Sequence, residues 1–404
     1  MRVLKFGGTS VWDLSRVLQI INESYHEGLC IVVSAVKNTT ALLREKNIRA
    51  VRKIFIEWAR DYNLRPVIEQ FWDHAEHLCR TKFTSNDKQQ EDLLLSYGER
   101  MTAYIIDKII HQTVGSSTFC DNIQVHGPFG DAIIVGITPR YPNPGTVLVV
   151  PGFYGYDRKV VKTIGTSGSD VTAGAMATVL NATEVVIYTD VKGIYSADPR
   201  IVPNATLLPE MTRWDAIELG YAGGNVLHPR TVSQLFDTDI VLWVRHLQAE
   251  GGTGTKVHDN ASASCTAVAL RDDQILVTVE GQHMCGIPGI ASELFDTLAI
   301  QGVSVSLITQ SCSECAISFA IAEEHVDAIH ELSNVANIQR VSVITLVGSN
   351  MKARIGVAAS LFSALAKSNI NVLAISQGST ERSISAVVAR QNGTDGLIAI
   401  HNRI

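Results

Sequence analysis

Three short and almost wholly apolar runs constrain the fold of this chain more than any other feature. They cover residues 29–34 (LCIVVS), 146–151 (TVLVVP) and 184–190 (EVVIYTD), and each ends in polar or turn-forming residues. Such runs are typical of parallel strands that are buried on both faces. Helical patterns lie between the runs, so the sequence predicts an α/β fold: a mostly parallel open sheet with helices on both faces. Ligands of such sheets bind beyond the carboxyl ends of the strands, where the polar residues gather.

The segment 163–174 (TIGTSGSDVTAG) is a glycine-rich loop that opens into a helix of small residues. Gly165 and Gly168 allow the backbone to approach an anion closely, and the N–H groups of the first helical turn after Ser169 have no intrahelical partner. The loop would therefore suit a phosphate, with Asp170 as its carboxylate. The alternative is an ordinary helix cap, in which Ser169 or Asp170 accepts hydrogen bonds from the following turn.

The N-terminal segment predicts another unit of strand, turn and helix. Residues 2–6 (RVLKF) are β-prone, residues 7–10 (GGTS) form a turn, and a helical pattern begins at Asp13. Lys5 lies at the end of the predicted strand, where its ammonium group could reach a transferring phosphate. A surface lysine is the alternative interpretation.

Further polar groups fall near the same predicted edge of the sheet. The loop from Ser34 to Thr40 follows a buried strand, and a helical region then extends from about 41 to 113. The residues 96–100 (SYGER) interrupt this helical pattern with a glycine. Glu99 is therefore either a solvated helix residue or a carboxylate that points into the crevice.

The next part of the chain predicts the end of the first domain. His228 precedes a proline in an apolar context, so we expect a structural histidine rather than a catalytic base. A last strand is predicted at 240–244 (IVLWV), and the segment 248–266 is rich in Gly, Ser and Thr. That composition is typical of a domain boundary.

The C-terminal third contains an internal repeat with a period of 67 residues. The matching segments are 289–299 with 356–366, 305–310 with 372–377, and 314–318 with 381–385. Each unit is expected to fold as strand, helix, strand, strand and helix, which indicates a small α+β sandwich used twice. Gln310 and Gln377 recur at a strand end, so a small polar ligand between the units is one hypothesis. Repeated packing alone would also preserve the pattern.

Size and composition limit the classes of function. A chain of 404 residues should hold about two to three domains. The net charge of −6 offers no basic surface for nucleic acid. No apolar run approaches the ~18 residues that a membrane-spanning helix needs. The seven cysteines show no metal-binding spacing, so we expect free thiols in a cytoplasmic protein.

Five motifs in this order make the chain resemble the aspartokinases of the amino-acid kinase superfamily. They are residues 5–11 (KFGGTSV), 96–99 (SYGE), 168–170 (GSD), 189–200 (TDVKGIYSADPR) and 226–231 (VLHPRT). The two repeats resemble tandem ACT domains, and their strand-end motifs resemble most the kinase half of bifunctional aspartokinase–homoserine dehydrogenases. The resemblance implies an amino-acid kinase domain at 1–260 and an ACT region at 261–404, with ACT domains at about 270–335 and 340–404.

The resemblance implies transfer of the γ-phosphoryl group of ATP, with Mg²⁺, to the side-chain carboxylate of aspartate. Lys5 is expected to stabilise the transferring group, and Asp170 to organise Lys5. The expected substrate contacts are Ser34, Thr40, Glu99, Ser169 and the position of Thr166. The expected nucleotide contacts are Gly7, Gly8, Gly168, Thr189, Asp190, Tyr195, Arg200 and Asn225. No protein ligand for the metal is expected, because phosphates and water bind it. The family further implies an amino-acid effector near Gln310 and Gln377, and a homodimer or larger homo-oligomer.

Two positions depart from the family pattern, and both remove positive charge. Thr166 stands where an arginine is expected to bind the substrate α-carboxylate, and Asn225 stands where a lysine is expected at the nucleotide phosphates. Three hypotheses follow. Another cation, Lys37 or Lys162, takes over one contact; or the acceptor is a different carboxylate-bearing compound; or the chain is a weakly active or silent regulatory subunit.

Overall fold

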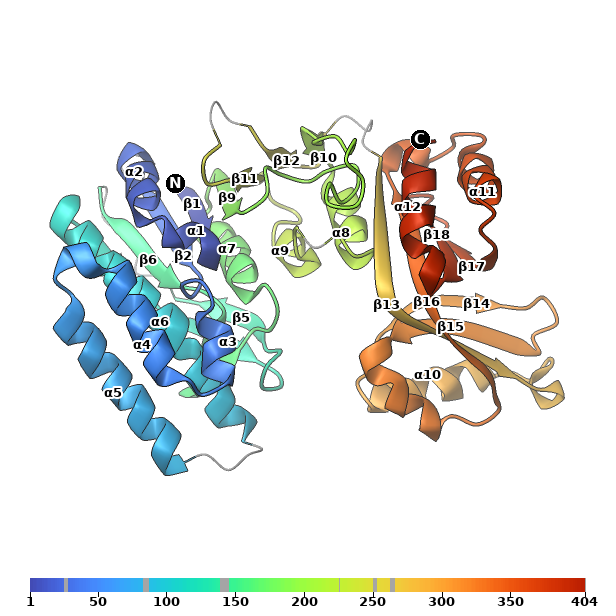
Figure 1. Cartoon of the computed structure of the whole chain (residues 1–404), viewed down its shortest axis with the longest axis horizontal. Coiled ribbons are helices and arrows are strands. Elements are labelled where there is room, and N and C mark those ends of the chain that lie inside the picture. The colour runs from blue at the N-terminus through green and yellow to red at the C-terminus, as the bar shows by residue number, and fades with distance from the viewer. Residues whose placement is uncertain are drawn as a thin grey trace. The chain divides into compact units, whose positions relative to one another are not determined.

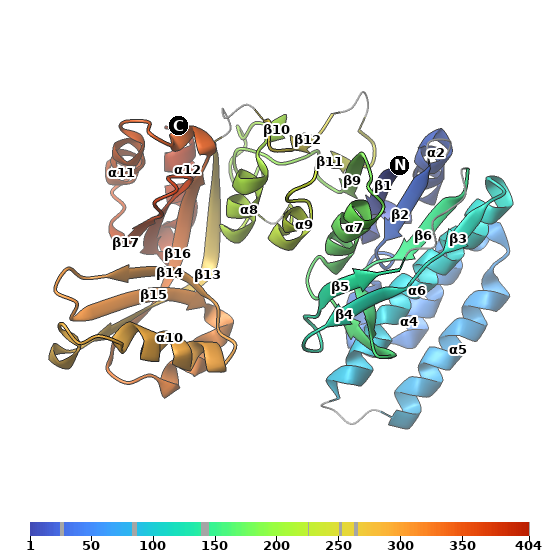
Figure 2. The same ribbon diagram turned by 180° about the vertical axis from the view of Figure 1, so that it is seen from behind.

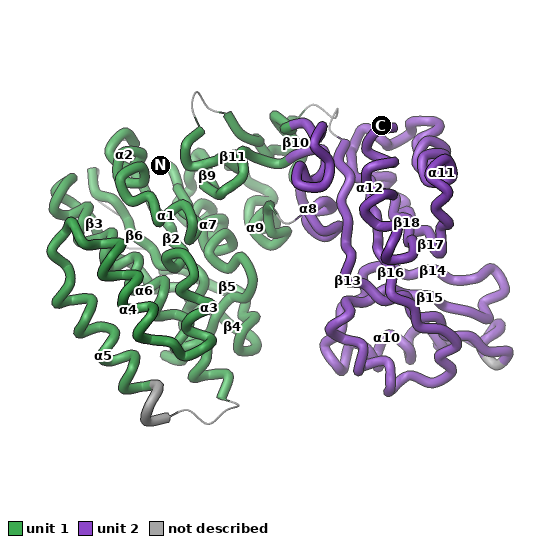
Figure 3. The backbone as a smooth tube through the Cα atoms, in the orientation of Figure 1, with its two compact units in different colours: residues 1–194, 207–213, 226–261 green, residues 195–206, 214–225, 262–404 purple. Residues whose placement is uncertain are grey.

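The computed structural model describes residues 1–24, 28–82, 87–138, 145–224, 226–249, 253–261 and 266–403. Contacts divide the chain into two compact units, which Figure 3 draws in different colours. The first unit comprises residues 1–194, 207–213 and 226–261, and the second comprises residues 195–206, 214–225 and 262–404. The domain limits that the sequence predicts, 1–260 and 261–404, stay predictions.

An eight-stranded sheet forms the centre of the first unit (Figure 1), and it confirms the prediction of a mostly parallel sheet. Its order is β10-β12-β11-β9-β1-β2-β6-β3, and only the β11–β12 pair is antiparallel. The strands are β1 (Arg2–Phe6), β2 (Leu29–Val33), β3 (Ser117–Phe119), β6 (Val147–Pro151), β9 (Glu184–Thr189), β10 (Glu210–Met211), β11 (Val241–His246) and β12 (Thr255–Val257).

Nine α-helices occur among the described residues from 1 to 233, and α8 belongs mainly to the second unit. They are α1 (Gly8–Trp12), α2 (Leu14–Ser24), α3 (Thr39–Arg44), α4 (Ile48–Trp58), α5 (Arg65–Lys82), α6 (Lys88–Thr113), α7 (Gly168–Val179), α8 (Arg213–Tyr221) and α9 (Pro229–Ser233). A four-stranded sheet that the sequence did not predict adds β4 (Ile123–His126), β5 (Ile133–Ile137), β7 (Tyr154–Asp157) and β8 (Val160–Thr163), in the order β5-β4-β7-β8.

Alternate residues of the central strands face two different helical layers. Leu4 and Phe6 of β1 belong to a large apolar core that includes buried residues of α2, α4, α5 and α6, and Figure 1 shows the last three helices together on one side of the strands. Val3 and Cys30 point to the opposite face and are also fully buried. Helix α7 contacts β1, β2 and β9 on that face. Burial on both faces explains why the strands are apolar throughout.

The second unit contains a six-stranded antiparallel sheet in the order β14-β15-β13-β16-β18-β17. Figure 2 shows it from behind, with α10 beside one half and α11 and α12 beside the other. The elements are β13 (Ala267–Glu280), α10 (Ile290–Ile300), β14 (Val305–Gln310), β15 (Ala316–Ala322), β16 (Val335–Val347), α11 (Val357–Lys367), β17 (Val372–Gln377), β18 (Ser383–Ala389) and α12 (Gly393–His401).

These elements confirm the 67-residue repeat, because α11, β17 and β18 each begin 67 residues after α10, β14 and β15. One detail was wrong. The first repeat ends in a 3₁₀ helix at Glu323–Glu331 rather than in an α-helix like α12.

Helix α6 corrects the prediction that Gly98 interrupts the helical pattern, since the helix continues through this residue. A Cβ atom at Gly98 would lie 2.8 Å from Cβ of Ala35 and 2.9 Å from Cγ2 of Thr39. The glycine therefore allows α6 to pack closely against the loop after β2, and its role is contact rather than a turn.

The segment 248–266, predicted as a boundary, contains β12, which pairs with β10 and β11 in the sheet of the first unit, and it also contains the end of that unit at Ala261. One further expectation needs correction. A disulfide joins Cys285 and Cys315, so these two cysteines are not free thiols. Cys30, Cys120 and Cys312 are free, while Cys265 and the side chain of Cys79 lie outside the described residues. Among the described helices, none is both long and apolar enough to cross a membrane.

Candidate functional site

The register of the parallel strands brings four loops to one edge of the sheet. Phe6 of β1 pairs with Val33 of β2 and with Tyr188 of β9, and Val33 pairs with Pro151 of β6. The four strands therefore end at the same level, and the loops that follow them lie side by side. The glycine-rich loop before α7 joins them through β7 and β8.

A cavity of about 440 Å³ opens at this edge. The predicted site residues that line it are Lys5, Gly8, Ser34, Thr40, Glu99, Gly168, Ser169 and Asp170. Other lining residues are Thr9, Ala35, Val36, Lys37, Asn38, Ala41, Phe153 and Ser167. The structure thus brings together residues from β1, α1, the loop after β2, α3, α6 and α7 that lie far apart in the sequence. Thr166 is exposed and is not among the lining residues.

Lys5 and Asp170 form an ion pair at the bottom of the site, with Nζ of Lys5 2.5 Å from Oδ1 of Asp170. Both side chains are about nine-tenths buried, at 10% and 11% exposure. Asp170 lies in the first turn of α7, and no side chain caps this helix; Ser167, with a left-handed φ of 56°, occupies the cap position. The hypothesis of a cap by Ser169 or Asp170 was therefore wrong. Asp170 instead pairs with Lys5.

Glu99 lies on α6, and its side chain reaches the same cavity. The residue is 4% exposed, and its Oε2 atom has no hydrogen-bond partner among the described residues. Burial raises the pKa of the Glu99 carboxyl from 4.5 to about 8, although the N–H of Ala35 and the charge of Lys5 oppose the shift. A buried carboxyl with an unpaired oxygen is suited to receive a cationic group of a ligand.

The loops after β1 and β2 contact each other directly. The backbone N–H of Lys37 donates to the carbonyl oxygen of Gly8 at 3.1 Å. A Cβ atom at Gly8 would lie only 2.5 Å from the carbonyl oxygen of Ala35, so no other residue fits here. Helix α1 begins at Gly8, and its first N–H groups are free to face an anion.

Asp92 is a structural residue of the site that sequence reasoning missed. Its carboxylate accepts hydrogen bonds from the backbone N–H of Gly130 at 2.9 Å and of Thr163 at 2.8 Å, and from Oγ1 of Thr163 at 2.8 Å. It therefore fastens α6 to the start of the glycine-rich loop. The signal was an acid seven residues before Glu99, which places both side chains on one helix face.

The comparisons with known proteins agree with this geometry. Residues 1–246 match the model of the amino acid kinase family, and residues 277–332 and 344–404 match that of an ACT domain. The chain belongs to the amino acid kinase family. It is 34% identical to the chloroplastic bifunctional aspartokinase/homoserine dehydrogenase 1 of Arabidopsis thaliana, over 99% of this chain and 50% of the relative. It is 29% identical to an aspartokinase of Bacillus sp. (strain MGA3), over 99% and 96%.

Solved structures show the same similarity for this amino acid kinase. Aspartokinase III of E. coli, in a complex with aspartate and ADP, matches with a TM-score of 0.88 and 26% identity, over 100% of this chain and 99% of that chain. The chain spans about half the length of the first curated relatives it matches, which are bifunctional enzymes. These likenesses confirm the resemblance to aspartokinases that the motifs indicate.

The predicted nucleotide contacts of the kinase have different places in the structure. Gly7, Thr189 and Asp190 lie at the ends of β1 and β9, and Oγ1 of Thr189 donates to Asp190 at 3.0 Å. Tyr195 and Arg200 belong to the second unit, and Arg200 pairs with Asp198 there. Asn225 lies outside the described residues. All these roles stay predictions.

His228 of the kinase has a local structural role, as expected. Its Nδ1 atom accepts a hydrogen bond from the backbone N–H of Arg230 at 3.2 Å and so caps α9. Burial and then the charge of Arg230 lower its pKa, while Asp170 and Asp131 oppose this shift. Arg230 itself forms a two-pronged ion pair with Asp131, at 2.6 and 3.1 Å.

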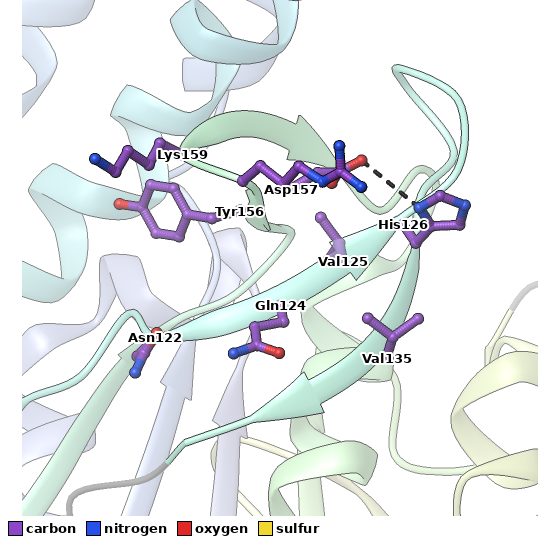
Figure 4. Close-up of a pocket in the computed structure, with 9 residues that line it drawn as sticks. Asn122, Gln124, Val125, His126, Val135, Tyr156, Asp157 and Lys159 are labelled. Atoms are coloured by element: carbon purple, nitrogen blue, oxygen red, sulfur yellow. Dashed lines mark ion pairs between the residues drawn. The ribbon is translucent and has the colours of Figure 1, made fainter.

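A larger cavity of about 750 Å³ lies on the four-stranded sheet (Figure 4). Side chains of β4, β5 and β7 line it, together with Arg158 and Lys159 of the β7–β8 turn. Figure 4 shows the ion pair between His126 and Asp157 at its rim. This cavity shares no lining residue with the Lys5–Asp170 site, and it lacks a helix N-terminus and a buried charge pair.

The two predicted effector residues, Gln310 and Gln377, end β14 and β17 and are exposed. Gln377 lines a cavity of about 240 Å³ together with Arg354, Glu381 and the start of α11. In the first repeat, the positions that lie 67 residues before this part of the second repeat include Cys285 and Cys315, and a disulfide joins these two residues. An effector role for either glutamine stays a prediction.

Proposed function

We propose that this chain transfers the γ-phosphoryl group of ATP to the side-chain carboxylate of L-aspartate. One observation carries the proposal: the buried Lys5–Asp170 pair and the buried, partly unpaired Glu99 line a single cavity at the carboxyl edge of a parallel sheet. Aspartokinase III of E. coli, which this chain resembles over its whole length, was crystallised with aspartate and ADP. That likeness favours aspartate over another acceptor and over a silent subunit.

In phosphoryl transfer the protein mainly positions the two substrates and neutralises the charge of the transferring phosphoryl group. A side-chain carboxylate oxygen of aspartate attacks the γ-phosphorus, the bond from this phosphorus to the bridging oxygen breaks, and ADP leaves with that oxygen. Lys5 faces the transferring group, and Asp170 holds the ammonium in place at 2.5 Å. The first turns of α1 and α7 would supply further positive ends near Gly8 and Ser169.

The acceptor side of the cavity has groups that fit an amino acid. Glu99 would bind the substrate ammonium through its unpaired oxygen, because a buried carboxylate is stabilised by a cation. The hydroxyl groups of Ser34, Thr40 and Ser169 would orient the substrate carboxylates. The cavity volume of about 440 Å³ lies within the usual range for small-molecule sites.

ATP is the proposed phosphoryl donor, and Mg²⁺ would accompany it. Gly7, Gly8, Thr189 and Asp190 lie at the strand ends where the phosphates and the nucleotide would be held. We include Tyr195, Arg200 and Asn225 in this group on the resemblance alone. The metal ion would neutralise the phosphates, which together with water suit its octahedral preference.

The test is an assay with L-aspartate, ATP and Mg²⁺ in which hydroxylamine traps the acyl phosphate as a hydroxamate. The wild type should form hydroxamate only when all three are present. Lys5→Met should lower kcat by about 100-fold or more, because a preorganised charge at the transferring group is lost. Lys53→Met, an exposed position on α4, is the matched control and should keep full activity. A wild type that binds ADP but gives no product with aspartate would reject the proposal.

Regulation, assembly and location follow as further parts of the proposal. The E. coli relative was also crystallised with lysine and aspartate, which supports an amino-acid effector for the ACT repeats of this chain. We propose a homodimer or larger homo-oligomer, because ACT units commonly pack in pairs through their sheets. We also propose that the chain works in the cytoplasm.

A further inference from the structure

We propose that Lys37 binds the α-carboxylate of the acceptor amino acid, in place of the arginine that the family pattern predicts at position 166. This inference rests on the proposed function, because it names a specificity determinant of the same site. It assigns a role to a residue of the loop after β2, whereas the expected arginine belongs to the loop before α7.

The loop before α7 provides no cation to the cavity. Thr166 is exposed and does not line it, and the next three residues, Ser167, Gly168 and Ser169, offer hydroxyl and backbone groups only. An α-carboxylate in this partly buried space would have to lose much of its hydration, so it needs a positive partner.

Two cationic side chains, Lys5 and Lys37, line the cavity, and Lys5 already forms an ion pair within the protein. The ammonium of Lys5 is 2.5 Å from the carboxylate of Asp170, and both side chains are largely buried. Lys37 is exposed, and no ion pair or side-chain hydrogen bond of its ammonium occurs among the described residues. Lys37 is therefore the lining cation that is available to a ligand.

The other basic residues near the glycine-rich loop have partners elsewhere. Nζ of Lys162 contacts the carbonyl oxygen of Gly127 at 2.6 Å and Oδ2 of Asp157 at 2.7 Å. The guanidinium of Arg230 is held by Asp131, and that of Arg100 lies over the rings of Tyr97, Tyr154 and Tyr156. Asp157 lines the separate cavity of Figure 4, and Lys162 does not line the cavity that holds Lys5 and Asp170.

Backbone contacts fix the position of the main chain at Lys37 beside the loop after β1. Its N–H donates to the carbonyl of Gly8, and Asn38, which follows it, has a left-handed φ of 65° that turns the chain into α3. Ser34, on the same loop, and Thr40, in the first turn of α3, line the same cavity. A flexible four-carbon stem on this anchored root can place its ammonium on the acceptor side.

The charges of the acceptor also fit this arrangement. Glu99 would receive the substrate ammonium, Lys5 faces the phosphoryl group, and the α-carboxylate is then left with Lys37 as its positive partner. Lysine is a point charge without the two-pronged geometry of arginine, so it should hold this carboxylate with less directional selectivity.

The test compares two acceptors, L-aspartate and its α-amide, which lacks the α-carboxylate charge, in steady-state assays with saturating ATP and Mg²⁺. Lys37→Met should raise KM for aspartate by about 10- to 100-fold, leave KM for the α-amide unchanged, and change KM for ATP by less than about threefold. Thr166→Arg in the Lys37→Met background should restore most of the affinity for aspartate. Lys162→Met, the rival cation, should leave KM for aspartate unchanged.

The proposal about Lys37 is overturned if Lys37→Met leaves KM for aspartate unchanged, if it raises KM equally for both acceptors, or if only KM for ATP changes. A wild type without turnover would reject the proposed function instead. In that case calorimetry measures Kd for aspartate and for its α-amide in the presence of ADP and Mg²⁺, and Lys37→Met should change these Kd values as predicted for KM. If the wild type does not bind aspartate, both the proposed function and the role of Lys37 are rejected.

Discussion

The affinity of the site for its acceptor should depend on pH through one residue, Glu99. Burial raises the pKa of its carboxyl to about 8, so at neutral pH the free protein holds it mainly protonated. A substrate ammonium prefers the ionised form, because only the carboxylate supplies a full negative charge. Aspartate binding near neutral pH should therefore release a proton.

We predict that KM for aspartate falls by roughly 10-fold between pH 6.5 and pH 8. Over this range the pH approaches the pKa of Glu99, so the ionised fraction of its carboxyl increases. Coupled assays of ADP release across this range measure the effect. Glu99→Gln should raise KM and remove most of its pH dependence, while KM for ATP serves as the control for titration of the nucleotide. A Glu99→Gln variant with the wild-type profile would assign the titration to another group.

The same shift predicts the sign of a stability effect. Between pH 4.5 and 8 the folded protein keeps the Glu99 proton, whereas the unfolded chain has released it. The folded state binds more protons, so this group lowers the free energy of unfolding as the pH rises through that window. Glu99→Gln should therefore gain stability relative to the wild type as the pH rises.

At the scale of elements, Asp92 connects α6 to β8 and to the turn before β5. Its carboxylate is 3% exposed and accepts two backbone N–H groups and one hydroxyl. Two of these donors belong to Thr163, directly before the glycine-rich loop. The position of this loop, and with it that of Ser169 and Asp170, should thus depend on Asp92.

We predict that Asp92→Ala lowers the free energy of unfolding by about 2–4 kcal/mol, because it leaves buried N–H groups without an acceptor. Asp92→Asn is the matched control and should stay within about 1 kcal/mol, since its amide oxygen can still accept both N–H groups. Urea denaturation measures both variants. Equal losses for the two would mean that charge, and not hydrogen bonding, is what the site needs.

The sequence was a good guide to elements with strong patterns. The apolar runs at 29–34, 146–151 and 184–190 became β2, β6 and β9, because strands buried on both faces leave a continuous signal. The four-stranded sheet was missed because its strands are short and half exposed. Gly98 suggested a break in α6, yet its cause is tertiary contact with Ala35 and Thr39, which no local pattern contains.

The site was predictable where chemistry and strand ends coincide. Lys5 and Ser34 follow directly from this rule, Asp170 was predicted from the glycine-rich loop before α7, and the structure brings all three into one cavity. Asp92 and the availability of Lys37 depend on which partners the other charged groups find, as the pairing of Lys162 with Asp157 shows. The fold determines these ion-pair partners, and the spacing of residues along the sequence does not predict them.

For the whole molecule, the two units have separate apolar cores, so they can unfold in separate steps. The core of the first unit is built on β1, β2, β6 and β9, and β13, β15, β16 and β18 contribute to those of the second. The disulfide of Cys285 and Cys315 lies wholly within the second unit and links residues 30 positions apart. Closing a loop of this length removes conformational freedom from the unfolded chain.

We predict that reduction of this disulfide lowers the melting temperature of the second unit by roughly 6–12 °C, from the loss of about 3 kcal/mol in a unit of this size. Calorimetry with and without a reductant should show one transition that moves and one that does not. Aspartate with ADP should raise the unmoved transition and so assign it to the first unit. Cys285→Ser should reproduce the shift, and Cys312→Ser, a free and exposed thiol of the same loop, should not. Identical melting curves for the oxidised and reduced protein would show that the second unit gains no stability from the link.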